Sequence, residues 1–176
     1  MKKITILLLP LMICHCRAMT QSTDAAIKGI RQTFQRINSD SSFQKITIDD
    51  PEEFLGHATD GGGELVGYFK NDSIHKIVLE VGLSYGETRA EYYFRNEKLV
   101  FVYETEKHFA TSDSAIDNTR IKPAFEGRYY FDKGKLISKI EKGSKRFGEK
   151  KEPAKTFMED AQEYILILKK RNKQSN

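Results

Sequence analysis

Cysteine is nearly absent from this chain. Its 176 residues include only two cysteines, Cys14 and Cys16, and both lie close to the N-terminus. The rest of the chain can therefore form no disulfide and offers neither a thiol nucleophile nor a cysteine metal ligand. A chain of this length is typical of one domain with a hydrophobic core of its own.

Sequence motifs of catalysis are lacking as well. There is no G-x-S-x-G motif, and the histidines His57, His75 and His108 stand far apart, without the short spacings typical of metal ligands. We therefore predict no catalytic residues, no metal site and no cofactor. The alternative from another functional class is an envelope hydrolase in which Glu91 or Glu126 acts together with a histidine.

A long hydrophobic run occurs once, over residues 4–13, and it is too short to span a bilayer. Lys2 and Lys3 precede this run, and Cys16 and Ala18 follow it at positions −3 and −1 of a cleavage after Ala18. This order of a positive end, an apolar stretch and small residues is typical of a secretory signal peptide.

We accordingly predict a leader over residues 1–18 and a single domain over residues 19–176. The mature protein is expected in the periplasm or outside the cell, with no transmembrane span. A lipoprotein of structural role, anchored through Cys14 or Cys16, is one alternative. A buried N-terminal helix is another.

A strong net charge is missing once the leader is set aside. Residues 1–18 hold three basic residues and no acid, so 26 Lys and Arg remain in the mature chain against 25 Asp and Glu. A nearly neutral protein lacks the overall field expected of a nucleic-acid binder. We therefore predict no nucleic-acid partner.

Two segments carry the periodicity of amphipathic helices. Residues 22–39 place Ile27, Ile30, Phe34 and Ile37 on one face, and residues 153–172 place apolar side chains on one face in the same way. A shorter helix is indicated by an acid followed by proline at positions 50 and 51, which is typical of a helix start.

Between the helices the hydrophobic period changes to two, as expected of strands rich in Tyr, Phe, Val and Ile. The strand-like runs are 64–70, 74–82, 89–95, 98–106, 125–131 and 136–142. A further short strand is indicated within 43–48. We predict an α+β fold, with an antiparallel sheet of about six strands flanked by an N-terminal and a C-terminal helix.

The strand runs share a repeated pattern. Three phenylalanines are each followed five residues later by an aliphatic residue, in the pairs Phe69 and Ile74, Phe94 and Leu99, and Phe131 and Leu136. Two-residue hairpin turns place residues i and i+5 opposite each other, one pair beyond the turn. We therefore predict three hairpins, each closed by an aromatic–aliphatic pair.

The tyrosines that precede these phenylalanines are the predicted binding residues. Because strand side chains alternate, Tyr68, Tyr93 and Tyr130 should lie on the opposite face of the sheet, near Arg89 and Arg128. Tyrosine mixed with arginine is typical of binding surfaces. The alternative is that a helix covers this face and makes it part of the core.

The stretch FEGRYYFDKGKL, residues 125–136, resembles the hairpin repeats of MORN-type proteins. The resemblance extends over about three hairpins, within residues 64–142. Such repeats are structural or interaction modules, so the resemblance implies binding. We expect a partner in the cell envelope, either a protein, a glycan or an apolar ligand, bound by a sheet face or by a polar loop at 107–124.

Overall fold

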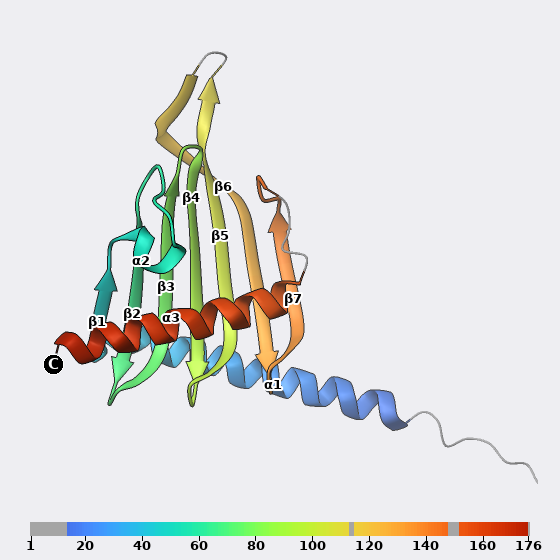
Figure 1. Cartoon of the computed structure of the whole chain (residues 1–176). Helices are drawn as coiled ribbons and strands as arrows, with labels where there is room; N and C mark the ends of the chain where they lie inside the picture. The colour runs from blue at the N-terminus through green and yellow to red at the C-terminus, as the bar shows by residue number, and fades with distance from the viewer. Residues whose placement is uncertain (1–13, 113–114, 148–151, 176) are drawn as a thin grey trace, which may run out of the picture.

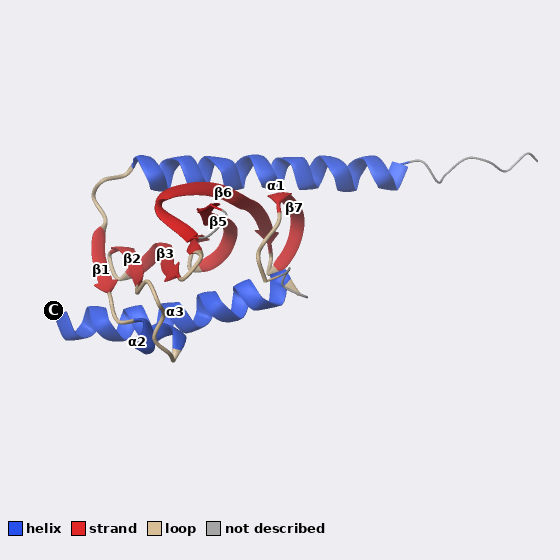
Figure 2. Cartoon of the chain, turned by 90° about the horizontal axis from the view of Figure 1, so that it is seen from above, coloured by secondary structure: helices blue, strands red, loops and turns tan. Residues whose placement is uncertain are grey.

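The computed structural model describes residues 14–112, 115–147 and 152–175, and they form one antiparallel sheet with a helix on each face (Figures 1 and 2). The seven strands follow one another in space in chain order. They are β1 (Gln44–Ile48), β2 (Gly63–Lys70), β3 (Ser73–Leu83), β4 (Gly86–Arg95), β5 (Lys98–Ser112), β6 (Ala115–Asp132) and β7 (Lys135–Gly143). The helices are α1 (Cys14–Ser39), α2 (Pro51–Leu55) and α3 (Pro153–Ser175).

The predicted fold class is confirmed, with seven strands where about six were expected. The additional strand is β1, which pairs antiparallel with β2 and places Ile46 opposite Gly67. The predicted start of the short helix is also confirmed. The side chain of Asp50 accepts a hydrogen bond from the Glu52 amide, and Pro51 is the first residue of α2.

All three predicted hairpins are present. Phe69 pairs with Ile74, Phe94 with Leu99 and Phe131 with Leu136. Each pair is followed by the same irregularity, because the neighbouring tyrosine pairs with a residue one place further along than regular pairing requires. The extra residues are His75, Val100 and Ile137, so each hairpin carries a β-bulge at the same position. The chain therefore repeats one hairpin design three times.

The turns of these hairpins have left-handed backbone conformations at both central positions. The residues are Asn71 and Asp72, Asn96 and Glu97, and Lys133 and Gly134, with φ between 49° and 73°. Positive φ at both positions is the geometry of type I′ turns, whose twist matches that of the flanking strands. Glu97 and Lys133 are the least suited of the six to this conformation, because they have neither the freedom of glycine nor the short polar side chain of Asn or Asp.

Replacing Lys133, where φ is 50°, should therefore stabilise the protein. We expect Lys133→Asn to raise the free energy of unfolding by about 0.5–1 kcal/mol, because it supplies the Asn-Gly pair that type I′ turns prefer. Chemical denaturation measures the change. Lys135→Asn, two residues away at the start of β7, is the control and should give no gain. Equal effects of the two substitutions would contradict the turn assignment.

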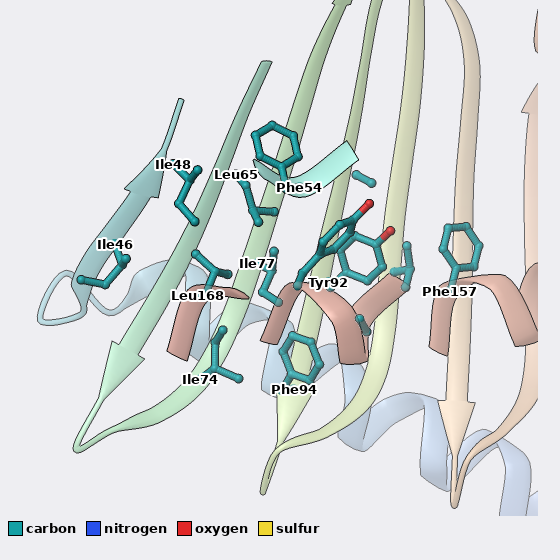
Figure 3. Packing of buried hydrophobic residues seen from close by; sticks show 14 of the residues in the cluster. Ile46, Ile48, Phe54, Leu65, Ile74, Ile77, Tyr92, Phe94, Phe157 and Leu168 are labelled. Atoms are coloured by element: carbon teal, nitrogen blue, oxygen red, sulfur yellow. The ribbon is translucent and has the colours of Figure 1, made fainter. Parts of the chain in front are cut away.

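The phenylalanines at the hairpin ends point to the α3 side. Phe69, Phe94 and Phe131 are buried there, together with Phe157 and Leu168 of α3. Figure 3 shows α3 crossing these strands, with Ile74, Phe94 and Leu168 gathered around it. This cluster is the larger part of the core.

Helix α1 covers part of the opposite face of the sheet. Ile30 and Ile37 of this helix are buried against Tyr93, Phe101 and Tyr130. The helix crosses near the hairpin ends of the strands, and no helix among the described residues lies over the other half of this face (Figure 1). On this side, α1 therefore covers only the part of the sheet near the hairpin ends of the strands.

The segment predicted as a polar loop at 107–124 is instead a continuation of the β5–β6 hairpin. The ladder continues through Lys107 opposite Pro123 and ends at Ser112 opposite Ala115. Two register shifts within it absorb the irregular spacing. A two-stranded ribbon exposed on both faces needs no apolar alternation, which is why its polar composition predicted a loop. This arm projects beyond the other strands (Figure 1).

The first helix begins earlier than its sequence pattern indicated. The predicted helix was 22–39, whereas α1 begins at Cys14 and passes through Ala18 without a break. The apolar run of the predicted leader, residues 4–13, lies outside the described residues. Within the described part of the chain, no helix combines the length and the apolar character needed to cross a membrane.

Candidate binding surface on the α1 side of the sheet

The strand register brings the three predicted tyrosines into one row. Tyr68 lies opposite Lys76, Lys76 opposite Tyr93, Tyr93 opposite Phe101, and Phe101 opposite Tyr130. Residues that face each other across a ladder project to the same side of the sheet. Arg128 lies in the next row, opposite Tyr103, and Arg89 lies one row further, opposite Thr105. All five predicted residues thus share the α1 face.

Helix α1 buries the centre of this row. Tyr93 is 0% exposed and Tyr130 is 4% exposed, whereas Tyr68 is half-buried. The expectation of an accessible tyrosine row is therefore wrong at Tyr93 and Tyr130, where the covered-core alternative holds. The physical reason is the apolar stripe of α1, which packs on the row. Phe34, for example, lies with its ring 4.9 Å from that of Tyr93.

The hydroxyl of Tyr93 belongs to a polar network at the C-terminal end of α1. It donates a hydrogen bond to Glu91, and it also contacts Asn38 of the helix. The amine of Lys76 lies 2.9 Å from Glu91 Oε2 and 3.0 Å from Asn38 Oδ1. Arg89 donates to the other carboxylate oxygen of Glu91. The network joins α1 to β3 and β4 and satisfies polar groups that the helix covers.

Burial and pairing act in opposite directions on the pKa values of Lys76 and Glu91. Burial lowers the pKa of Lys76, although its bond to Glu91 partly restores it. Burial also acts to raise the pKa of Glu91, but hydrogen bonds from Tyr93 and Lys76 outweigh it and leave that pKa lowered. The pKa of Tyr93 is raised, first by burial and then by Glu91. Glu91 is thus held as a carboxylate between two cations.

This pKa shift predicts a dependence of stability on acid pH. Because the pKa of Glu91 is lower in the folded state, the unfolded state binds more protons near pH 4. The stabilisation is complete above the ordinary pKa of glutamate and is lost as the pH falls through the folded-state pKa. The unfolding free energies of wild type and Glu91→Gln should therefore converge between about pH 6 and pH 3. Denaturation at several pH values tests this, and a constant difference would contradict it.

Beside α1, the uncovered part of this face contains a hollow of about 420 Å³. We call it the α1–β6 hollow. Its lining residues are Ile30, Arg31, Phe34 and Gln35 of α1, Phe101 and Tyr103 of β5, and Arg128 and Tyr130 of β6. Its volume falls in the range of about 300–1,000 Å³ typical of small-ligand sites.

Two arginines stand over aromatic rings of the α1–β6 hollow. The guanidinium carbon of Arg128 lies 5.5 Å from the ring centre of Tyr103, and that of Arg31 lies 5.9 Å from the ring centre of Tyr130. Arg128 also forms an ion pair with Glu126. Stacking on the rings holds both cations at the edge of an apolar floor.

The remaining predicted residues lie elsewhere on the face. Tyr68 lines a second hollow of about 340 Å³ at the C-terminal end of α1, together with Phe43, Lys45 and Lys76. Arg89 lines a third, of about 390 Å³, and forms ion pairs with Glu80 and Glu91. The structure therefore joins only Arg128 and Tyr130 in one site.

Sequence reasoning missed the α1 side of this hollow. Arg31, Phe34 and Gln35 line it because of where α1 crosses the sheet, and the strand pattern does not encode that position. Tyr103 could have been found, since it lies two residues after Phe101, on the same face of β5, and opposite Arg128.

The carboxylates proposed for a hydrolase have other partners. Glu91 is held by Lys76, Arg89 and Tyr93, and Glu126 pairs with Arg128. The histidine that does contact a carboxylate is His108, whose Nε2 lies 2.6 Å from Glu106. Among the residues with described side chains, no group of three or more His, Cys, Asp and Glu could hold a metal ion.

Comparison with protein-family models, with curated proteins and with solved structures gave no significant match. The functional assignment therefore rests on the geometry of this chain.

Proposed function

We propose that this protein is an exported, non-catalytic binding module of the cell envelope, which binds its partner on the α1 face of the sheet. The observation that carries the proposal is the α1–β6 hollow. It combines an apolar floor of Phe34 and Phe101 with two arginines at its edge. Apolar pockets with a few convergent polar groups are the usual form of ligand sites.

The hairpin repeat supports a binding role. Three hairpins with the same closing pair and the same bulge build one continuous sheet. In MORN-type proteins, which the chain resembles over this region, such hairpins serve as structural or interaction modules. On this view the repeated hairpins are the scaffold, and the helix laid across them completes the site.

The packing of α1 is compatible with removal of a leader. The residues that anchor the helix are Ile27, Ile30, Phe34 and Ile37, and all of them follow Ala18. Cleavage after Ala18 would leave these contacts in place. The intact mass of the protein recovered from its native cells tests export. A mature chain starting at or near Met19 supports it, a lipid mass on Cys14 or Cys16 supports the anchored form, and an intact Met1 contradicts it.

A steric block of the hollow tests the binding role. Gln35 is an exposed lining residue, so Gln35→Trp should fill the hollow without disturbing the core. We expect it to abolish capture of the partner from a solubilised envelope extract, with proteins, glycans and lipids all analysed. Gln32→Trp is the matched control, because Gln32 is an exposed residue on the same helix outside the lining.

The control variant should capture the partner as the wild type does, and both variants should melt at nearly the same temperature as the wild type. Capture that survives Gln35→Trp unchanged would contradict the assignment of this face.

A further inference from the structure

The side chains that line the α1–β6 hollow form an apolar part and a cationic part. The apolar part is formed by Ile30, Phe34 and Phe101, with the rings of Phe34 and Phe101 5.6 Å apart and nearly perpendicular. Phe101 continues to Tyr130, 4.9 Å away between ring centres. Ile30, Phe101 and Tyr130 are almost completely buried, and Phe34 is half-buried, so these side chains form an apolar floor on which an aliphatic chain can lie.

The cationic part comes from two different elements. Arg31 projects from α1 and Arg128 from β6, and each is stacked on a tyrosine that lines the hollow. Among the described residues, no carboxylate lies within ion-pair distance of Arg31. A guanidinium presents its N–H donors in a planar fork that matches a carboxylate.

Arg128 is already paired with Glu126 through one terminal nitrogen. A guanidinium carries five N–H donors, so Arg128 can hold Glu126 and a second carboxylate together. Glu126 lowers the net positive charge at this edge, and the two arginines and one glutamate leave a single excess positive charge. A ligand with one negative charge would balance it.

We propose that the α1–β6 hollow binds a fatty acid, with its carboxylate at Arg31 and Arg128 and its chain along Ile30, Phe34 and Phe101. A neutral apolar ligand would leave the guanidinium of Arg31 without a carboxylate for its N–H donors. A small anion such as acetate would make no contact with the apolar floor. Only a ligand with both parts uses the whole surface. This inference rests on the proposed function and names the ligand class for the same site.

Calorimetric titration of the purified protein with decanoate, below its micelle concentration, tests the proposal. We expect saturable binding of one decanoate per chain. Decanol, which has the same chain without the charge, should bind at least about tenfold more weakly, because a hydrogen bond to a charged group is lost. Acetate, which has the charge without the chain, should show no saturable binding.

Two arginine variants on α1 locate the carboxylate. Arg31→Gln should weaken decanoate binding by about tenfold or more and bring it close to that of decanol. Arg36→Gln removes an exposed arginine of the same helix that does not line the hollow, and it should leave the affinity unchanged. Gln35→Trp should abolish binding.

Three results would overturn the proposal: no saturable binding of decanoate, equal binding of decanoate and decanol, or equal effects of Arg31→Gln and Arg36→Gln. Failure of decanoate to bind while Gln35→Trp still abolishes partner capture would overturn the fatty-acid assignment and leave the proposed function standing. If decanoate does not bind and partner capture also survives Gln35→Trp unchanged, both the fatty-acid assignment and the proposed function are overturned.

Discussion

Replacing Tyr93 with alanine is expected to lower the free energy of unfolding by about 3–5 kcal/mol, as for other buried aromatic side chains. Tyr93 is fully buried, and its ring packs on Phe34 of α1 and Phe101 of β5. The substitution also removes the hydroxyl that bonds Glu91 and Asn38. Alanine at this position would therefore loosen α1 from the sheet as well as open a cavity.

Chemical denaturation of Tyr93→Ala and Tyr93→Phe separates the two contributions. Phenylalanine keeps the ring and removes only the hydroxyl, and Glu91 keeps its contacts with Lys76 and Arg89. We expect Tyr93→Phe to cost about 1.5–3 kcal/mol, the usual contribution of a hydrogen bond to a charged group. A loss below about 1 kcal/mol for Tyr93→Ala, as at an exposed position, would show that α1 does not cover this residue.

The second large effect is expected on the opposite face. Phe94 is 1% exposed, lies at a hairpin end and packs in the cluster beneath α3. Phe94→Ala should lower the free energy of unfolding by about 3–5 kcal/mol. Because Phe69 and Phe131 occupy the same place in their hairpins, alanine there should have effects of the same order.

Phe147 provides a control of the same residue type. It is 81% exposed, and its ring contacts that of Tyr85 at 5.3 Å. Phe147→Ala should change the free energy of unfolding by less than about 1 kcal/mol. Similar melting shifts for Phe94→Ala and Phe147→Ala would contradict the placement of Phe94 in the core.

The hairpins could be predicted from sequence because their determinants are local. A two-residue turn fixes which residues face each other, so the spacing from Phe94 to Leu99 specifies a pair without knowledge of the rest of the fold. Strand alternation then assigns Tyr93 to the opposite face from Phe94. The same local rules identified the helix cap at Asp50.

The position of the helices on the sheet could not be predicted in this way. The stripe of Ile30, Phe34 and Ile37 indicates that α1 packs on something, but a stripe does not specify which face or which row. The burial of Tyr93 and Tyr130 depends on that choice. Half of the residues that line the candidate site depend on it too, namely Ile30, Arg31, Phe34 and Gln35.

The arm of β5 and β6 was missed for a different reason. Its strands are stabilised by pairing with each other, with Phe109 also donating a backbone hydrogen bond to Tyr85. No helix in the described part of the chain packs against either of its faces, so the hydrophobic period that marks the other strands is absent.

Photocrosslinking from position 35 tests the central claim most directly. A photoreactive amino acid with a small aliphatic diazirine, close in size to glutamine, placed at position 35 at the edge of the α1–β6 hollow would react with whatever occupies the hollow in the producing cells. The control position is Leu166, which is 71% exposed on α3, on the other side of the sheet. The proposed function predicts an adduct at position 35 and none at position 166, with the mass of a fatty acid if the ligand assignment is right. Adducts at position 166 alone, or at neither position, would contradict binding on the α1 face.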